Sequence, residues 1–227
     1  MKIGITYAES NFEKYTEWLD HFKVDYVVLD HNSRDEGFEN FKECSGLILS
    51  GGADVYPELY CDWDTKETKG TYLPERDGFE MKLMEECEKR NIPVFGICRG
   101  IQLINVYYRG SLIFDLEEIR NTNHRKISKT EQRFHNVNII KDTLLFDIVK
   151  SEKAIINSSH HQAADRLGEG LMINAKSDEG VVEGIEYSDK AGKPFMIAVQ
   201  WHPERMPFDD QVSVNILNKF LSECVEK

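Results

Sequence analysis

An α/β protein with a mainly parallel central sheet and helices on both of its faces is predicted by two features of this sequence. Short apolar segments alternate with amphipathic segments through the first half of the chain, which is typical of βαβ units. The apolar segments are almost continuous, as expected for a parallel sheet that helices cover on both sides. The second half is strand-rich, because several strand-like segments follow one another with little helix between them.

The expected elements follow from this pattern in chain order. The first half is expected to have strands at residues 2–7, 24–29, 46–50 and 92–97, and helices at residues 12–22 and 77–90, where apolar side chains recur at helical spacing. The second half is expected to have strands at residues 134–140, 154–157, 171–175, 181–187 and 194–200, followed by a helix at residues 210–225.

Two polar segments, residues 56–70 and 120–133, are expected to be surface loops, and loops of this length are often functional. No internal repeat, low-complexity tract or linker divides the chain. Residues 1–227 are therefore expected to form a single domain.

Charge and composition exclude several classes of protein. Hydrophobic residues make up 41% of the chain and charged residues 30%, while the net charge is −12. This charge argues against binding to nucleic acid or to an anionic membrane surface. No apolar run could span a bilayer, no signal segment precedes the first strand, and the five cysteines form no C-x-x-C pair. We therefore expect a cytoplasmic protein without disulfides.

Cys98 is the candidate nucleophile. It lies in residues 96–100 (GICRG), at the end of the strand expected at residues 92–97, and a helical pattern of apolar residues follows at residues 101–107. This is the cysteine form of a nucleophile elbow, in which small residues allow a sharp, strained turn. Such a turn places the sulfur above the carboxyl end of the sheet and at a helix N-terminus, where the helix dipole favours a thiolate. The alternative is a buried structural cysteine, which is the commoner role of a lone cysteine.

A nucleophilic cysteine needs a base, and the base needs an orienting group. His202 lies just past the end of the last predicted strand, and Glu204 can bind one nitrogen of its ring while the other faces the thiol. Taken alone, His202 could equally be a polar loop residue, but together with the elbow it is the candidate base.

The paired glycines Gly51 and Gly52 follow a buried strand. Their backbone N–H groups, with the amide of Arg99 after the nucleophile, could form an oxyanion hole. The alternative is a tight turn without a catalytic role.

Together these segments resemble the class I glutamine amidotransferase superfamily. The resemblance rests on residues 96–100 with Gln102, on the paired glycines and on residues 200–204 (QWHPE), and it extends from about residue 2 to residue 222. It implies a flavodoxin-like class I glutamine amidotransferase fold for the whole chain.

Further segments resemble the γ-glutamyl hydrolase branch of that superfamily, which includes the γ-glutamyl-γ-aminobutyrate hydrolases. They are residues 51–60 (GGADVYPELY), residues 158–163 (SSHHQA), and Arg76-Asp77 followed by Glu80. The resemblance implies a Cys98–His202–Glu204 triad that cleaves a γ-glutamyl amide to glutamate and an amine through a γ-glutamyl thioester. It implies an oxyanion hole at Gly52 and Arg99, and neither a metal ion nor an organic cofactor.

The resemblance also implies substrate-binding residues: Gly51, Gln102, His160, His161 and Gln162. Gln102 could equally serve helix packing. Adjacent His160 and His161 should point to opposite sides of an extended segment, so they cannot easily share a metal ion. We expect one of them to line the pocket and the other to support it.

The sequence departs from the hydrolase pattern after the elbow, where Tyr107, Tyr108 and Arg109 replace commonly small residues. This departure could change helix packing or the shape of the pocket, and the triad is unaffected by it. The expected partner is a small γ-glutamyl substrate, with a homodimer left open. Two alternatives remain: a glutaminase subunit that passes ammonia to a synthase partner, and a non-enzymatic binding homologue.

Overall fold

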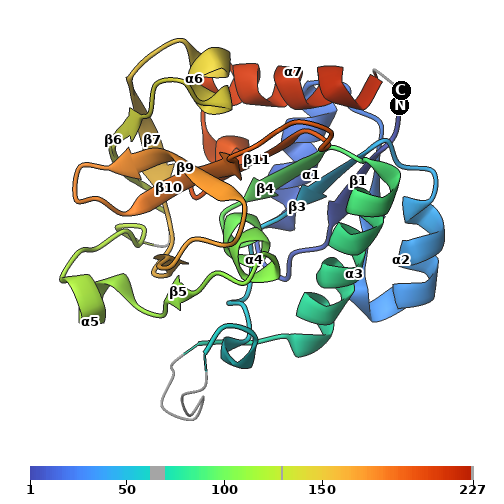
Figure 1. Ribbon diagram of the computed structural model, residues 1–227, viewed down its shortest axis with the longest axis horizontal. Coiled ribbons are helices and arrows are strands. Elements are labelled where there is room, and N and C mark those ends of the chain that lie inside the picture. Colours follow the sequence, from blue (N-terminus) through green and yellow to red (C-terminus); the bar gives the residue numbers. More distant parts are fainter. Residues whose placement is uncertain (62–69, 129, 226–227) are drawn as a thin grey trace.

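The computed structural model describes residues 1–61, 70–128 and 130–225, so the loop expected at residues 56–70 lies largely outside the described residues. A nine-stranded mixed sheet, in the order β2-β1-β3-β4-β11-β10-β9-β6-β7, runs through the protein (Figure 1). Its strands are β1 (Ile3–Thr6), β2 (Tyr26–Leu29), β3 (Gly46–Leu49), β4 (Val94–Ile97), β6 (Arg133–Ile139), β7 (Lys153–Ser158), β9 (Leu171–Ser177), β10 (Val182–Tyr187) and β11 (Met196–Val199).

The sheet has a parallel half and an antiparallel half that meet at β11. Strands β2, β1, β3, β4 and β11 pair in parallel, whereas β10, β9, β6 and β7 continue the sheet with antiparallel pairs. The α/β fold and the strand-rich second half are therefore confirmed. Because β11 comes from the end of the chain and lies beside β4, segments about 100 residues apart in sequence leave the sheet at one edge.

Helices cover the parallel half on both faces (Figure 1). One apolar core lies between the sheet and the helices α2 (Arg34–Phe41), α3 (Pro74–Arg90) and α4 (Arg99–Tyr107). The other core lies on the opposite face, under α1 (Phe12–His21), α6 (Leu144–Val149) and α7 (Gln211–Val225). Short 3₁₀ helices lie at His31–Ser33, Pro57–Leu59 and Pro203–Arg205. In the described part of the chain, no helix is long and apolar enough to cross a membrane.

Some elements were not expected from the sequence. They are α2, α5 (Leu116–Arg120), α6 and a two-stranded sheet of β5 (Leu112–Ile113) and β8 (Ala163–Ala164). Helix α2 contains Gly37 and only two apolar side chains, so its sequence has little helical signal of its own. Its Phe41 is nevertheless buried in the core, and this tertiary contact stabilises the helix.

Candidate active site

Cys98 lies at a strained turn between β4 and α4. Its backbone has φ 53° and ψ −100°, a conformation that residues other than glycine rarely adopt and that is typical of functional sites. The turn also requires a close approach of α4 to β3. A Cβ at Gly100 would lie 2.4 Å from the backbone oxygen of Leu49, so only glycine fits at this position.

His202 is brought to the same edge of the sheet by β11. Val199 of β11 is opposite Ile97 of β4, and the Cys98 amide donates a hydrogen bond of 2.8 Å to the Val199 carbonyl. The chain then turns so that His202 Nδ1 lies 2.7 Å from Glu204 Oε1. All three side chains of the predicted triad are buried together.

The charge of the His202 ring depends on its two neighbours. Burial opposes protonation of His202, but the adjacent Cys98 sulfur and the Glu204 carboxylate raise the pKa of this imidazole to about 9. Burial likewise opposes ionisation of Glu204, yet the His202 imidazolium lowers the pKa of the Glu204 carboxyl group below its ordinary value. The geometry thus favours an imidazolium between a carboxylate and the sulfur at neutral pH.

The backbone of the paired glycines is fixed by two buried side chains. The Gly51 amide donates to the Tyr15 hydroxyl at 2.8 Å, and Arg76 Nη2 donates to the Gly51 carbonyl at 2.8 Å. Gly52 has φ +133°, and a Cβ there would lie 2.2 Å from Arg76 Nη1. The Gly51 amide already has an acceptor, whereas the Gly52 amide has none among the described residues. The Arg99 amide, at the first turn of α4, also lacks an intrahelical acceptor.

A buried network of ion pairs lies next to the elbow and the glycine pair. The Arg99 side chain contacts Asp77 and Glu80, and Arg76 Nε donates to Glu80 Oε1 at 2.9 Å. Burial opposes ionisation of Glu80, but Arg76 and Arg99 lower the pKa of its carboxyl group. The network joins α3 to the elbow and to the glycine pair.

One amide side chain contacts the Cys98 sulfur, and further amides are hydrogen-bonded behind it. Gln200 Nε2 lies 3.6 Å from Cys98 Sγ, and Gln102 Nε2 donates to Gln200 Oε1 at 3.3 Å and to the Gln162 carbonyl at 3.1 Å. Gln102 and Gln162 are both buried in this network, Gln162 through a further bond of 3.2 Å to the Phe114 carbonyl.

Asn157, at the end of β7, is a site residue that sequence reasoning missed. Its side chain accepts from the His202 amide and donates to the His202 carbonyl, both at 2.8 Å. The residue immediately precedes the segment at residues 158–163 that resembles the hydrolases, and this position was the only available signal in the sequence.

The two adjacent histidines have separate surroundings. His161 Nε2 lies 3.0 Å from Asp54 Oδ1, and its Nδ1 lies 3.3 Å from Asp115 Oδ2. Burial opposes protonation of His161, yet these carboxylates raise the pKa of its ring. The His160 ring is buried and turned toward Glu183 instead.

A cavity of about 780 Å³ opens beside the glycine pair. It is lined by Gly52, Asp54, Asp115 and His161 among others. A Cβ at Gly51, the neighbour of Gly52, would lie 3.6 Å from Cys98 Cβ, so the cavity lies near the elbow, although its lining does not include Cys98, His202 or Glu204. The site therefore combines a strained thiol, a polarised imidazole, two backbone donors and a nearby cavity.

Comparisons with known proteins show the family to which this chain is similar. A family model described as Peptidase C26 matches residues 4–204. Protein NtpR of Enterococcus hirae is 34% identical over 226 residues, which cover 96% of this chain and 90% of that protein. The γ-glutamyl-γ-aminobutyrate hydrolase PuuD of Escherichia coli K12 is 28% identical over 222 residues, which cover 93% of this chain and 85% of the hydrolase.

A solved structure shows the same fold at low sequence identity. The glutaminase domain of the CTPS of Trypanosoma brucei, with bound acivicin, superposes with a TM-score of 0.65 and 16% identity. The superposition covers 100% of this chain and 94% of that domain. This likeness extends the class I glutamine amidotransferase fold to the whole described chain.

Proposed function

Because the chain belongs to the Peptidase C26 family of glutamine amidotransferase-like proteins, we propose that it is a γ-glutamyl amide hydrolase with Cys98 as its nucleophile. The observation that carries the proposal is the meeting of three side chains at the ends of two adjacent parallel strands. Cys98 follows β4 in a strained turn, and the hydrogen-bonded pair of His202 and Glu204 follows β11.

In the first half of the proposed reaction, Cys98 Sγ attacks the γ-carbonyl carbon of the substrate. The carbonyl oxygen becomes an oxyanion, which the amides of Gly52 and Arg99 stabilise as hydrogen-bond donors. His202 then gives a proton to the amine as the carbon–nitrogen bond breaks, leaving a γ-glutamyl thioester on Cys98.

In the second half, water replaces the amine. Neutral His202 accepts a proton from the water, the resulting hydroxide attacks the thioester carbon, and the carbon–sulfur bond breaks to release glutamate. Glu204 keeps the imidazole oriented and stabilises its charged form in both halves. Each proton that His202 gives in the first half returns to it in the second.

The cavity favours a leaving amine that carries a positive charge. Among its described lining residues are five carboxylates, against one arginine and one histidine. Three of the carboxylates are in ion pairs, Glu9 with Arg76 and both Asp54 and Asp115 with His161, so the excess of negative charge is smaller than this count. Arg125 is already paired with Asp115 at 2.7 Å, so it is not free to bind a carboxylate of the substrate. A diamine or polyamine conjugate of glutamate would be attracted to this wall, whereas the carboxylate of γ-aminobutyrate would be repelled.

The test compares kcat/KM for three substrates with the isolated protein: glutamine, γ-glutamyl-γ-aminobutyrate and a γ-glutamyl diamine. A hydrolase should release glutamate from at least one of the two conjugates faster than from glutamine. Each tenfold preference corresponds to about 1.4 kcal/mol of transition-state binding. A preference for glutamine on the order of 3 kcal/mol would overturn the proposal and favour an ammonia-delivering subunit.

A further inference from the structure

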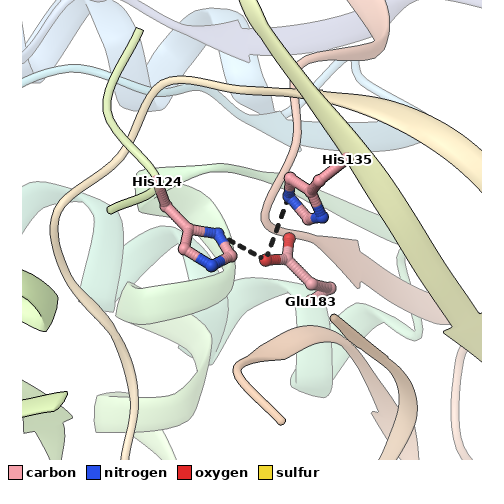
Figure 2. Close-up of side chains that lie close together, drawn as sticks. All are labelled: His124, His135 and Glu183. Carbon is pink, nitrogen blue, oxygen red and sulfur yellow. Dashed lines mark ion pairs between the residues drawn. The ribbon is translucent and has the colours of Figure 1, made fainter. Parts of the chain in front are cut away.

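Three histidines surround one buried glutamate behind the proposed triad. His124 lies in the segment between α5 and β6, His135 on β6, His160 just after β7, and Glu183 on β10. Figure 2 shows the rings of His124 and His135 directed at the Glu183 carboxylate. The Glu183, His124 and His160 side chains are each at least nine-tenths buried, and the His135 side chain is 15% exposed.

The local backbone explains how Glu183 reaches this position. The register of β10 against β9 shifts between Val182 and Gly184, so Glu183 lies at a bulge. A bulge redirects a side chain away from the regular alternation of the strand, and bulges are frequent beside functional sites. Four separate segments thus meet at one carboxylate.

The polar atoms that face one another here are unsatisfied. Both carboxylate oxygens of Glu183 lack a hydrogen-bond partner, as do His124 Nδ1, His135 Nε2 and His160 Nε2. Burying so many unpaired polar atoms costs free energy unless something else binds them.

Hydrogen bonds of the Nδ1 atoms, on the side of each ring away from Glu183, fix the tautomers of His135 and His160. His135 Nδ1 lies 2.9 Å from the Asn136 carbonyl oxygen, and His160 Nδ1 lies 2.9 Å from the Gln162 carbonyl oxygen. A carbonyl only accepts, so each Nδ1 carries the hydrogen and each Nε2 of the neutral ring presents a lone pair. Two lone pairs therefore face a carboxylate, an arrangement that is repulsive unless a proton or a metal cation lies between them. Histidines that bind metals are commonly held by this kind of bond to a backbone carbonyl.

The distances fit a transition metal. His124 Nδ1 lies 3.1 Å from Glu183 Oε1, and the Nε2 atoms of His135 and His160 each lie 3.6 Å from the same oxygen. The ligand atoms of His124, His135 and Glu183 are all within 4.8 Å of one another. Zinc bonds of about 2.0–2.2 Å in a tetrahedron place ligand atoms roughly 3.3 Å apart. Small shifts of the side chains would complete the coordination.

We propose that His124, His135 and Glu183 form a binding site for one divalent transition-metal ion of the zinc type. These three protein ligands leave a fourth position of the tetrahedron, toward which the neighbouring His160 ring could shift. The metal would fasten the segment between α5 and β6 to β6 and to β10, which pairs with β11. The Gln200 amide donates to the Glu183 carbonyl at 2.8 Å, and Ser158 Oγ donates to the His124 carbonyl at 2.6 Å. His161, turned to Asp54 and Asp115, takes no part.

The test is metal binding, measured independently of hydrolysis. Chelator-treated protein is dialysed to equilibrium with zinc chloride and the bound metal is counted by mass spectrometry, for the wild type and for His135→Gln, Glu183→Gln and His21→Gln. His21 is an exposed residue at the end of α1, so its variant is the matched control. We expect one zinc per chain in the wild type and the control. The two cluster variants should bind it more weakly by at least the ~10–100-fold that loss of a supporting hydrogen bond costs.

Cobalt distinguishes this cluster from the proposed triad as the place of binding. Cobalt bound by nitrogen and oxygen ligands should show weak visible bands without an intense thiolate-to-cobalt band, and Cys98→Ala should leave these visible bands unchanged. His135 is partly exposed, so His135→Gln provides a folded test, checked by circular dichroism, even if Glu183→Gln misfolds. Three results would each overturn the proposal: no zinc bound by the folded wild type, equal affinity in wild type and His135→Gln, or a thiolate band with cobalt. None of them depends on which amide the enzyme cleaves.

Discussion

The Cys98 backbone is held in a conformation that favours glycine, although a side chain is present there. The surrounding contacts maintain this strain: the Cys98 amide is bonded to β11, and α4 packs on the backbone of β3 at Gly100. A merely structural cysteine needs no such turn, because a buried small apolar side chain fits equally well within a regular strand or helix. The strain therefore favours the role of nucleophile.

Replacing Cys98 tests that role directly. Cys98→Ala should lower glutamate release by on the order of 10⁴-fold or more, because the covalent intermediate cannot form. The fold should persist, since alanine is smaller and adds no polar group. Cys61→Ser at a half-buried loop position is the control and should retain activity. Steady-state kinetics with a γ-glutamyl amide measures both, and near-normal turnover in Cys98→Ala would remove Cys98 from the mechanism.

The raised pKa of His202 predicts the alkaline limit of activity. A pKa raised from 6.5 to about 9 means that the imidazolium persists through neutral pH and is lost as the pH rises through about 9. Because the leaving amine needs that proton, kcat/KM should fall above about pH 9. Glu204→Gln removes the charge that stabilises the imidazolium. In this variant, kcat/KM measured as a function of pH should therefore begin to fall at a lower pH.

The same variant should also be slower at every pH. Loss of an orienting carboxylate in another triad lowers kcat by about 10⁴-fold, which is an upper guide. If Glu204→Gln has the same rate as the wild type, and its kcat/KM falls at the same alkaline pH, then Glu204 is not the third residue of the triad.

At the residue scale, the sequence predicted the site residues that lie just after the end of a predicted strand. Cys98 directly follows β4 and His202 lies three residues past the end of β11, so the carboxyl edge of a parallel sheet could be predicted to bring them together. Asn157 could not be predicted, because its role depends on β7 lying at the far edge of the sheet while its end turns back to His202. The His124–Glu183 contact depends equally on long-range packing and a bulge.

At the scale of elements, the contact between α4 and β3 explains the glycine after the nucleophile. A Cβ at Gly100 would meet the Leu49 backbone, which cannot move aside without displacing β3. Gly100→Ala should therefore destabilise the protein by about 1–3 kcal/mol and reduce activity by displacing the elbow. Thermal or denaturant unfolding and kinetics of the same preparation measure the two effects.

Gly78→Ala is the matched control for that substitution. Gly78 lies inside α3, and a Cβ there would have no atom within 4 Å. Removing the flexibility of a helical glycine should stabilise the protein by about 0.5–1 kcal/mol without changing activity. If both alanine variants unfold alike, the close approach at Gly100 is not what requires glycine.

Elements with a continuous apolar run or a clear helical periodicity were predicted well from the sequence. The strands β1, β3 and β4 and the helices α1 and α7 lie within a few residues of their expected bounds. Short elements were missed because they depend on partners far along the chain: β5 pairs with β8 across about 50 residues, and Leu145 of α6 is buried in the core shared with α1 and α7. Local sequence holds little information about such contacts.

At the scale of the whole molecule, the alternation of strands and helices predicted the parallel half, but not the order of the strands. The proposed triad forms because β11, near the end of the chain, lies beside β4, from its middle. The net charge of −12 argues against nucleic acid as a partner, and the structure shows where part of this charge lies. The cavity beside the elbow is lined by carboxylates, which gives the charge a bearing on the choice of substrate.

This charge predicts how substrate preference responds to salt. A γ-glutamyl diamine should have a higher kcat/KM than γ-glutamyl-γ-aminobutyrate at low ionic strength, because the cavity attracts a cation and repels a carboxylate. Raising the salt from about 0.01 M to about 1 M shortens the screening length from roughly 30 Å to roughly 3 Å. The preference should therefore shrink as salt is added, mainly through KM.

Two variants test whether the carboxylates of the cavity cause this preference for the diamine conjugate. Glu118→Gln removes a carboxylate of the lining, whereas Glu39→Gln removes one from α2 that does not line the cavity. The first should reduce the preference for the diamine conjugate and its dependence on salt, and the second should leave both unchanged. A preference for the γ-aminobutyrate conjugate at low salt, or equal effects of the two variants, would show that the acidic wall does not select the leaving amine.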